Sequence, residues 1–229
     1  MKKNLVILSG AGMSQESGIR TFRDMDGLWE EYDVMEVATP EAWARNPELV
    51  MKFYNDRRRQ LYDCVPNAGH VGLVDLEKYF DVNIITQNID DLHERAGSAN
   101  VLHLHGELKK ARSSVDESLI YDIQGWELKF GDLCVRGSQL RPHIVWFGEA
   151  VPAMDQAIPM VQNADILAVI GTSLNVYPAA GLVSYTHRGT PVYVIDPERP
   201  EMLMRQVNYI QEKAGRGVEI LKELLIKEV

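Results

Sequence analysis

The chain has few cysteines, no long hydrophobic run and no excess of basic residues. Its 229 residues include two cysteines, Cys64 and Cys134, which lie far apart in the sequence. No apolar stretch is long enough to span a bilayer, and the first apolar run, residues 5–8, is too short for the core of a signal peptide. The net charge of −9 argues against a nucleic-acid-binding surface. We therefore expect a cytoplasmic protein with reduced thiols and without nucleic-acid or membrane partners.

What the sequence does contain is an alternation of short apolar runs, rich in β-branched residues, with segments of helical periodicity. This alternation is typical of a parallel sheet covered by helices, and a chain with 45% hydrophobic residues suffices for one such α/β domain with a modest insertion. We predict strands over residues 5–8, 82–86, 101–103, 166–170 and 192–195, and a sixth at 209–210. We predict helices over residues 40–46, 48–62, 69–78, 178–188 and 218–227. The segments 24–38 and 109–141 break the alternation, and we expect them at the carboxyl edge of the sheet, where α/β proteins bind ligands.

A glycine-rich turn follows the first predicted strand. The turn consists of Gly10, Ala11, Gly12, Met13 and Ser14. A strand that leads through such a turn into a helix points backbone N–H groups at a diphosphate, because side chains would block that approach. Glycine pairs also occur in plain tight turns, so this turn alone leaves dinucleotide binding and a structural role open.

Two further predicted strands end in residues that suit a dinucleotide. Gly171, Thr172 and Ser173 follow one strand and offer small side chains and hydroxyl groups to a phosphate or a ribose. Asp196 follows another, and an acidic residue at a strand end is the usual ligand of a ribose diol. Asp196 also precedes Pro197, so a turn residue is the alternative interpretation. Together the three strand ends favour a dinucleotide.

Polar residues that suit catalysis follow two more apolar runs. Gln87, Asn88 and Asp90 come after the strand predicted over 82–86, and His105 comes after the strand predicted over 101–103. An imidazole titrates near neutral pH, which suits a general base, although a lone histidine beside a strand is more often structural. The polar cluster upstream and the glycine that follows His105 favour the catalytic interpretation.

These motifs, taken in order, carry a family resemblance. They are residues 10–19 (Gly-Ala-Gly-Met-Ser-Gln-Glu-Ser-Gly-Ile), 21–23 (Thr-Phe-Arg), 87–90 (Gln-Asn-Ile-Asp), 105–106 (His-Gly), 143–149 (His-Ile-Val-Trp-Phe-Gly-Glu) and 171–180 (Gly-Thr-Ser-Leu-Asn-Val-Tyr-Pro-Ala-Ala). The chain resembles the sirtuins, the NAD-dependent protein lysine deacylases, from about residue 5 to residue 197.

The resemblance implies one catalytic domain over residues 1–229. Within it, a Rossmann-like parallel sheet with helices on both faces takes about residues 1–23, 63–108 and 142–229. A small inserted part takes about residues 24–62 and 109–141. The substrate is expected in the cleft between the two parts.

The resemblance and the strand ends together predict an NAD site. Its expected residues are Gly10, Ala11, Gly12, Ser14, Arg20, Phe22, Arg23, Gln87, Asn88, Ile89, Asp90, Gly171, Thr172, Ser173 and Asp196. By the resemblance, Asp90 binds the carboxamide of nicotinamide, and Asn88 binds the ribose and an ordered water. Phe22 shields the reactive carbon, while Arg20 and Arg23 contact a phosphate or order their loop.

The resemblance assigns catalysis to His105, Asn88 and Asp90. His105 is the expected general base, which takes a proton from a ribose hydroxyl so that this oxygen attacks the alkylimidate intermediate. Gln87 contacts the nicotinamide-side ribose. The products implied are nicotinamide and O-acyl-ADP-ribose.

The run over residues 145–149 alternates apolar and other residues, and by itself it is compatible with a buried strand. In the sirtuins it is an open edge to which the substrate peptide adds as a strand, so that backbone hydrogen bonds supply affinity with little sequence selection. The expected peptide contacts are Val145, Phe147, Gly148, Glu149 and Val176. The implied partners are acyl-lysine proteins or peptides, and a monomer is compatible with the sequence.

A tyrosine and an arginine suggest which acyl group is removed. Tyr54 and Arg57 are three positions apart on a predicted helix and therefore project from one face, where a phenol and a guanidinium suit a carboxylate. They resemble the Tyr-x-x-Arg pair of the sirtuins that remove succinyl, malonyl and glutaryl groups, and Ala38 matches the small residue that widens their acyl pocket. The alternative is a solvated basic helix face, in which residues 57–59 pair with nearby acids such as Glu48 or Asp56.

The sequence departs from the family in its metal site. Sirtuins usually carry two Cys-x-x-Cys pairs that bind zinc, and the corresponding positions here are Ser113, Asp116, Leu133 and Arg136, with Cys134 out of register. This set does not suit zinc, so we predict no metal. We expect apolar packing to hold the small part instead, through Leu119, Ile120, Tyr121, Trp126, Leu128 and Phe130.

We therefore expect an NAD-dependent protein lysine deacylase that prefers acidic acyl groups. Three alternatives remain open: an NAD(P)-dependent oxidoreductase, a protein mono-ADP-ribosyltransferase, and a non-catalytic sensor of NAD or ADP-ribose. The oxidoreductase lacks support because the chain has no recognisable Tyr-x-x-x-Lys pair, and its glycine turn departs from Gly-x-Gly-x-x-Gly.

Overall fold

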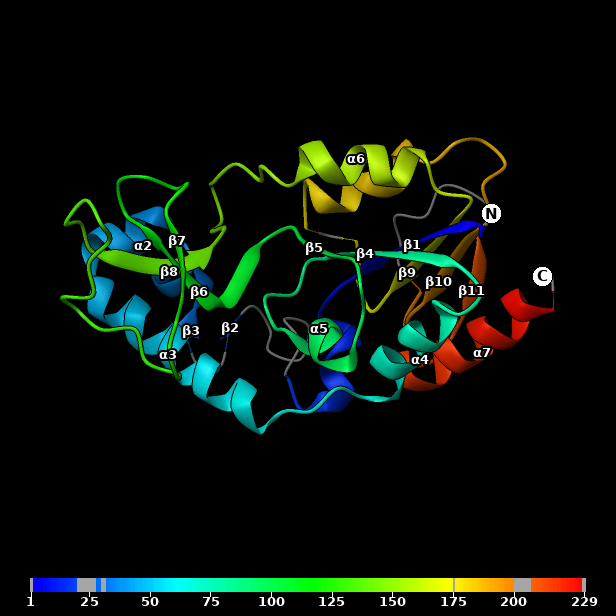
Figure 1. Cartoon of the computed structure of the whole chain (residues 1–229), viewed down its shortest axis with the longest axis horizontal. Helices are drawn as coiled ribbons and strands as arrows, with labels where there is room; N and C mark the ends of the chain where they lie inside the picture. The colour runs from blue at the N-terminus through cyan, green and yellow to red at the C-terminus, as the bar shows by residue number, and fades with distance from the viewer. Residues whose placement is uncertain (1, 20–27, 30–31, 175, 200–206, 228–229) are drawn as a thin grey trace.

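The computed structural model describes residues 2–19, 28–29, 32–174, 176–199 and 207–227. It contains a large parallel sheet between two helical layers and, at one end, a smaller antiparallel sheet with helices of its own (Figure 1). The last strand at one edge of the large sheet leads directly into the small sheet, so the ends of the large sheet's strands lie where the two parts meet.

The large sheet has the strand order β11-β10-β9-β1-β4-β5, and all neighbours pair in parallel. Its strands are β1 (Asn4–Ser9), β4 (Asp81–Thr86), β5 (Val101–His103), β9 (Ile166–Ile170), β10 (Val192–Ile195) and β11 (Asn208–Ile210). All six strands predicted from the sequence are confirmed. So is the fold class, a Rossmann-like sheet with helices on both faces and a small inserted part.

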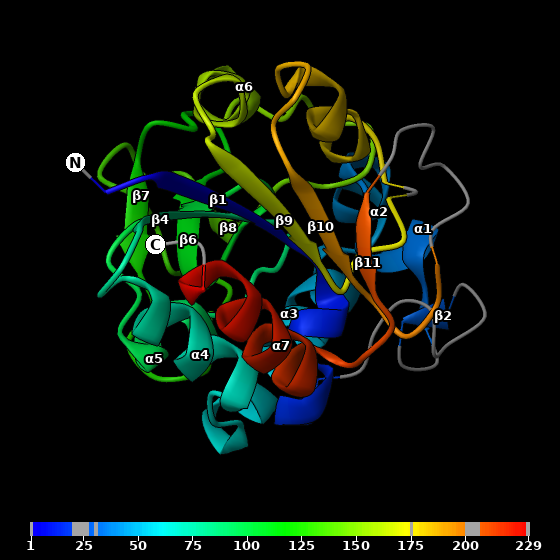
Figure 2. The same ribbon diagram turned by 90° about the vertical axis from the view of Figure 1, so that its right-hand side faces the viewer.

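Both faces of the large sheet are covered. Helices α4 (Ala68–Leu76) and α7 (Ala214–Ile226) lie on one face, and α6 (Met154–Gln162) and the 3-10 helix η4 (Ala179–Tyr185) lie on the other (Figure 2). The central strand β1 serves both layers: Leu5 and Ile7 belong to the first cluster, and Val6 and Leu8 to the second. This division follows from the alternation of side chains along a strand.

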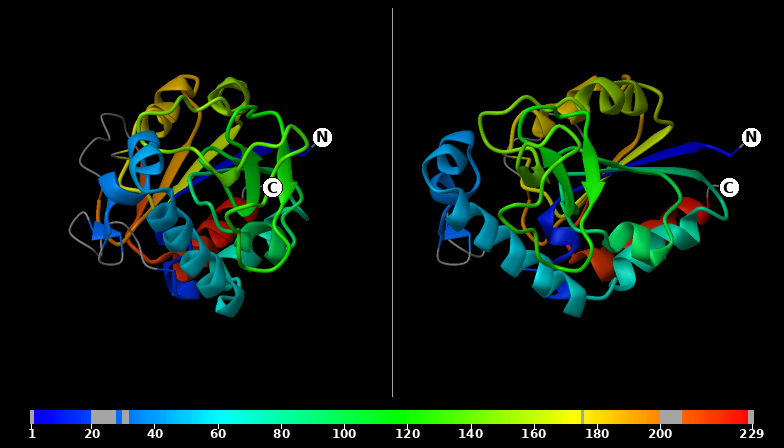
Figure 3. Two further views of the ribbon diagram at one scale, coloured as in Figure 1. Left: turned by 90° about the vertical axis from the view of Figure 1, so that its left-hand side faces the viewer. Right: turned by 60° about the vertical axis from the view of Figure 1, so that its left-hand side comes forward.

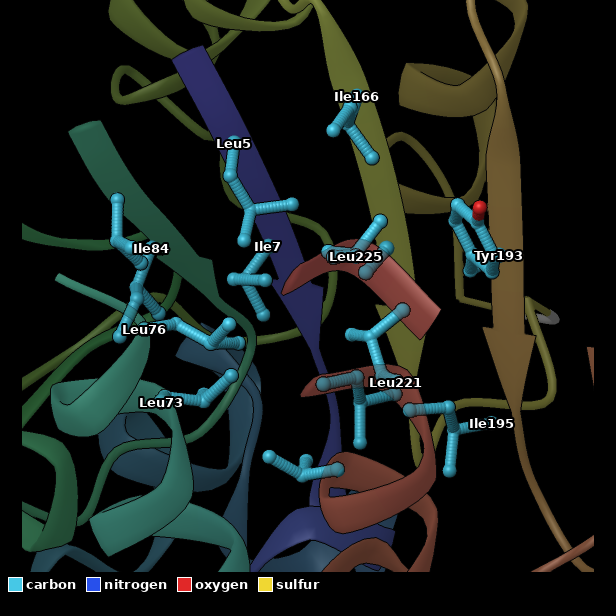
Figure 4. Close-up of a cluster of buried hydrophobic side chains, with 14 of the residues drawn as sticks. Leu5, Ile7, Leu73, Leu76, Ile84, Ile166, Tyr193, Ile195, Leu221 and Leu225 are labelled. Carbon is cyan, nitrogen blue, oxygen red and sulfur yellow. The ribbon is translucent and has the colours of Figure 1, made fainter. Parts of the chain in front are cut away.

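Figure 4 shows the first of these two clusters, where leucines of α4 and α7 pack against isoleucines of the strands. Leu73, Leu76 and Leu221 are fully buried there. Each such side chain contributes about 1.5–3 kcal/mol when it leaves water. The apolar periodicity that predicts these helices is therefore also what fixes them on the sheet.

The predicted helices are confirmed, with one change of type. Helices α2 (Pro40–Arg45) and α3 (Pro47–Asp63) occupy the first two predicted ranges. The segment predicted as a helix over 178–188 is the 3-10 helix η4, which contains Gly181 and Val183, residues of low helix propensity. Helices α5 (Leu92–Ala96) and α6 escape prediction because α5 has only five residues and α6 contains Pro159. In the ranges that the structure describes, no helix has both the length and the apolarity to cross a membrane.

The small part consists of a three-stranded antiparallel sheet beside α2 and α3 (Figure 3). Its strands, in the order β7-β6-β8, are β6 (Gly106–Ser113), β7 (Ile120–Asp122) and β8 (Leu140–Ile144). Before α2 lie the short pair β2 (Leu28–Trp29) and β3 (Tyr32–Asp33) and the one-turn helix α1 (Val34–Val37).

The predicted apolar packing of the small part is correct for half of its members. Leu128 is buried in a cluster with Ala111 of β6, and Leu119 and Tyr121 pack against that cluster. The prediction is wrong for three residues that are exposed, namely Ile120, Trp126 and Phe130. Ile120 and Tyr121 are neighbours in β7 and must face opposite sides, while the other two lie in the connection between β7 and β8.

Candidate active site

Five strand ends singled out by the sequence, those of β1, β4, β5, β9 and β10, lie at one edge of the large sheet. The order of strands reverses at β1, since β4 lies on one side of it and β9 on the other. Such a reversal separates the connecting loops and leaves a crevice in which α/β proteins bind ligands. Side chains join the loops there: Gln87 Nε2 donates to Thr172 Oγ1 (3.1 Å), and Asn88 Nδ2 donates to the Gly10 carbonyl (3.1 Å).

The glycines after β1 and β9 bring two turns into backbone contact. A Cβ on Gly10 would lie 2.6 Å from Thr172 Cβ, and one on Gly12 would lie 2.7 Å from Gly171 Cα. The amides of Gly10 and Gly12 donate to the carbonyls of Ile170 (3.0 Å) and Gly171 (2.8 Å). These two amides join the turns to each other and are therefore not among the N–H groups of the turn that could contact a diphosphate. The contact of the turn with NAD stays a prediction.

The turn after β1 also does not lead into an α-helix. It continues as two single-turn 3-10 helices, η1 (Ala11–Met13) and η2 (Gln15–Ser17). Gly18 ends the second with a left-handed φ of +92°, a conformation that glycine adopts without strain. The sequence pattern therefore predicts the position of the turn at the sheet edge correctly, but it predicts the wrong type of helix after the turn.

A buried network fixes the polar residues that follow β4. Ser14 Oγ donates to Asp90 Oδ2 (2.9 Å) and accepts from Asn88 Nδ2 (3.1 Å), and the Leu92 amide donates to Asp90 Oδ1 (3.2 Å). All three side chains are buried. Burial raises the pKa of Asp90, although these hydrogen bonds act in the opposite direction. The predicted catalytic residues Asn88 and Asp90 thus come together with Ser14 of the glycine turn.

His105 lies between β5 and β6, with its ring turned toward the same loop. Its Nδ1 is 3.0 Å from the Gln87 carbonyl oxygen. Because a carbonyl only accepts hydrogen bonds, Nδ1 carries the proton and Nε2 keeps its lone pair. Burial lowers the pKa of His105, so the ring is neutral at pH 7. A neutral imidazole in this tautomer is suited to act as a general base through Nε2.

The lowered pKa of His105 predicts how activity depends on pH. A base works only when it is unprotonated, so we expect the acidic limb of kcat/KM to have its midpoint below pH 6.5, the ordinary value for histidine. The measurement is a pH series with an acetyl-lysine peptide, whose acyl group does not titrate. An acidic midpoint above pH 6.5 would contradict this assignment.

The remaining predicted cofactor residues divide into two groups. Asp196 is buried after β10 and accepts the Glu198 amide at Oδ1 (2.9 Å), which is the turn role considered as the alternative from the sequence. Its contact with a ribose stays a prediction. Arg20, Phe22 and Arg23 lie outside the described residues.

The predicted acyl residues are buried together on one side of α3. Tyr54 is 0% exposed, Arg57 is 6% exposed, and Ala38 belongs to the same hydrophobic cluster as Tyr54. The alternative of a solvated helix face is therefore wrong for this pair. Asp56, named as a partner in that alternative, forms its ion pair with Lys52 instead (2.8 Å).

The predicted peptide-binding run is a turn, not a strand. Glu149 Oε2 accepts the Trp146 amide (2.8 Å), which folds residues 145–149 back on themselves, and Gly148 has a φ of +90°. The alternative interpretation as a buried strand is wrong because the run includes a glycine in a left-handed conformation and an acidic side chain that closes the turn. Glu149 is correspondingly directed into the protein, with its side chain only 16% exposed.

The turn is attached to both predicted parts of the site. The Val145 amide donates to the His105 carbonyl (2.9 Å), and the Phe147 amide donates to the Ala38 carbonyl (3.0 Å). These two amides are therefore not open to an added strand. The Phe147 side chain is 46% exposed, and Val176 on the loop after β9 is 36% exposed. Peptide contacts by these side chains and by Gly148 stay predictions.

The positions of the family's zinc ligands hold a different set of interactions. Asp116 and Arg136 form an ion pair (3.0 Å), and Ser113 Oγ lies 2.9 Å from Ser138 Oγ. A leucine has no donor atom and an arginine is a cation, so Leu133 and Arg136 do not fit a zinc ion. The ion pair and the hydrogen bond connect the same two turns that the metal would join.

Sequence reasoning missed the residues that connect these features. Trp146 Nε1 donates to the Tyr54 hydroxyl (3.1 Å), and Arg141 donates to Glu149 (2.8 Å). His103 donates from Nδ1 to the Asn88 carbonyl (2.9 Å). All three lie in or beside the motifs, but a contact between segments distant in sequence leaves no local signal. Arg58, which belongs to the basic run over residues 57–59, is buried and donates to the Leu108 carbonyl of β6.

Comparison with known proteins agrees with this geometry. The sequence model of the Sir2 family matches residues 10–178. A protein of Helicobacter pylori named NAD-dependent protein deacylase is 55% identical over 228 residues, with 98% of each chain covered, and a protein of Bacteroides thetaiotaomicron with the same name is 55% identical over 230 residues with the same coverage. A crystal structure of a Sir2 homologue with NAD is 40% identical, with a TM-score of 0.88, covering 99% of this chain and 91% of the other. The chain belongs to the Sir2 family.

Proposed function

We propose that this chain is an NAD-dependent protein lysine deacylase that prefers acidic acyl groups such as succinyl and malonyl. The observation that carries the proposal is the position of His105, whose ring is bonded to the Gln87 carbonyl beside Asn88 and Asp90. The family relatives named NAD-dependent protein deacylase support the general activity. The buried pair Tyr54 and Arg57 supports the preference for an acidic acyl group.

The residues at the sheet edge fit NAD. The turns after β1 and β9 approach so closely that no side chain occupies the crossing, which leaves backbone at the edge of the crevice. Next to it, Asn88 and Asp90 supply amide and carboxylate groups held by Ser14. In this proposal NAD is held by Gly10, Ala11, Gly12, Ser14, Gln87, Asn88, Ile89, Asp90, Gly171, Thr172, Ser173 and Asp196. NAD supplies the ribose carbon that loses nicotinamide and accepts the acyl oxygen.

His105 acts on the acyl transfer. Its Nε2 accepts the proton of a ribose hydroxyl, while the Nδ1 hydrogen bond to the Gln87 carbonyl fixes the tautomer and the ring. The same carbonyl contact stabilises the positive charge that the ring acquires when it takes the proton. Neutral His105 is the form present at pH 7 because burial lowers its pKa.

Tyr54 and Arg57 receive the distal carboxylate of the acyl group. A buried guanidinium forms stronger charge-assisted hydrogen bonds than an exposed one, because water competes less with the anion. Burial raises the pKa of Tyr54, so its hydroxyl stays protonated and available as a donor. An acetyl group ends in a methyl group, which has no hydrogen-bond acceptor for either side chain. Ala38, beside Tyr54 in the same cluster, keeps the wall of the pocket small.

The replacement Arg57→Met tests the acyl preference. We expect kcat/KM for a succinyl-lysine peptide to fall about 10- to 100-fold, because a hydrogen bond to a charged group is worth about 1.5–3 kcal/mol. The acetyl-lysine reaction should change little. Deacylation and nicotinamide release are measured on the same peptide with each acyl group, and reactions without NAD should give no product.

Arg59→Met is the matched control, since Arg59 lies on the same helix but is exposed. It should leave both reactions unchanged. An equal loss of both reactions in Arg57→Met would refute the carboxylate receptor, and turnover without NAD would refute the deacylase assignment.

A further inference from the structure

Trp146 connects the turn over residues 145–149 to the acyl side of the site. Its Nε1 lies 3.1 Å from the Tyr54 hydroxyl oxygen, and the two side chains are 2% and 0% exposed. An indole N–H only donates, whereas a phenol both donates and accepts. Tyr54 therefore accepts from Trp146, which leaves its own hydrogen available for a different acceptor.

We propose that Trp146 is a specificity-determining positioning residue, which makes Tyr54 a hydrogen-bond donor to the acyl group. The inference rests on the proposed function, in which Tyr54 and Arg57 receive a carboxylate. With the Tyr54 oxygen occupied by Trp146, both side chains present donors only. A carboxylate has only acceptors, so it satisfies this pair, whereas an amide of the same size places an N–H group against a donor.

The indole is locked in place by an ion cluster of the small sheet. The Arg141 guanidinium carbon lies 3.4 Å from the centroid of the Trp146 ring, and Arg141 donates two hydrogen bonds to Glu149 (2.8 and 3.0 Å). Arg112 of β6 donates to the same carboxylate (3.1 Å). Glu149 in turn accepts the Trp146 amide (2.8 Å). Both the backbone and the ring of Trp146 are therefore fixed by β6 and β8.

This cluster also gives Glu149 a role other than peptide contact. Burial alone would raise the pKa of Glu149, but hydrogen bonds from Arg141 and from the Trp146 amide bring it below the ordinary value. The charged carboxylate is thus bound to two arginines and to the backbone of the turn. Its position determines where the Trp146 N–H points and, through it, where the Tyr54 hydroxyl points.

The test compares acyl selectivity in Trp146→Phe, which removes the N–H and keeps an aromatic ring. The substrates are one peptide carrying succinyl-lysine, its terminal amide analogue succinamoyl-lysine, or acetyl-lysine. We expect the ratio of kcat/KM for succinyl over succinamoyl to fall about 3- to 10-fold, with the acetyl reaction changed much less. In a Tyr54→Phe background, adding Trp146→Phe should not change the ratio further, because the hydroxyl it orients is gone.

Trp43→Phe is the matched control, since Trp43 packs against Trp146 with ring centroids 5.8 Å apart. It should leave the ratio unchanged. If Trp146→Phe does not fold, as judged by its thermal transition, 3-benzothienylalanine at position 146 keeps the bicyclic ring and lacks only the N–H.

The outcomes separate this inference from the proposed function. A native chain that prefers succinyl, together with an unchanged ratio in Trp146→Phe, overturns the role of Trp146 alone. An effect of Trp146→Phe that persists in the Tyr54→Phe background also overturns it. A native chain with no succinyl preference overturns the proposed acyl class itself, before any variant is compared.

Discussion

Replacement of His105 by alanine should reduce deacylation about 10²- to 10⁴-fold, the usual contribution of a positioned general base. The reason is geometric, since the Gln87 carbonyl fixes the His105 tautomer so that Nε2 carries the lone pair. Because the ring is a proton acceptor rather than a peptide ligand, we expect the loss in kcat, with little change in the affinity for the acyl peptide. Single-turnover rates at saturating NAD and peptide measure the first quantity, and peptide binding without NAD measures the second.

His187→Ala is the control for that experiment, because His187 is exposed after η4 and the substitution is the same. It should keep the native rate. A His105→Ala variant that retains the native single-turnover rate would show that the base is a different group.

Replacement of Gly106 by alanine should have the largest effect on stability. Gly106 has a φ of +80°, and a Cβ there would lie 2.0 Å from the His143 carbonyl oxygen, which is backbone of the neighbouring strand β8. The left-handed conformation costs about 1–2 kcal/mol for a residue with a side chain. Because the carbonyl is part of the sheet, the strands must separate to admit the methyl group. We expect a total loss of about 3–5 kcal/mol in the free energy of unfolding.

Gly125→Ala separates the cost of the left-handed conformation from the cost of the steric clash with the neighbouring strand. Gly125 has nearly the same φ, +79°, but no atom lies within 4 Å of its added Cβ. In denaturant unfolding, this variant should lose only the about 1–2 kcal/mol that the left-handed conformation costs. It should keep its activity. Gly106→Ala should also lose activity, since His105 is the preceding residue. Equal unfolding free energies for the two variants would contradict the close approach of β6 and β8.

Strands β1, β9 and β10 of the large sheet were predictable because each buries both faces and therefore has a continuous apolar sequence. Leu5 to Leu8 is such a run, and the structure places its alternate residues in the two core clusters. The small part was harder to predict because it contains a strand that is not buried on both faces. Its strand β7 has one exposed face, so Ile120 and Tyr121 gave an apolar pair of which only one packs inward.

The site shows the same division between local and distant information. Asn88, Asp90 and His105 follow strands, and parallel strands bring their ends to one edge whatever lies between them in the sequence. The position of the glycine turn was predictable, but the hydrogen-bond partners of its amides were not. Those partners, the carbonyls of Ile170 and Gly171, are some 160 residues away in the chain. No local pattern records a partner at that distance.

The sequence by itself determined the parallel sheet, the positions of the polar residues at its edge, and the loss of the zinc ligands, because each is a property of residue type and local spacing. Only the tertiary structure decided that Tyr54 and Arg57 are buried, that residues 145–149 form a turn, and that Trp146 links that turn to Tyr54. Burial and hydrogen-bond partners depend on which distant segments come together. A helix face with three arginines has the same local sequence pattern whether it is exposed to water or covered by β6, so the pattern does not predict its burial.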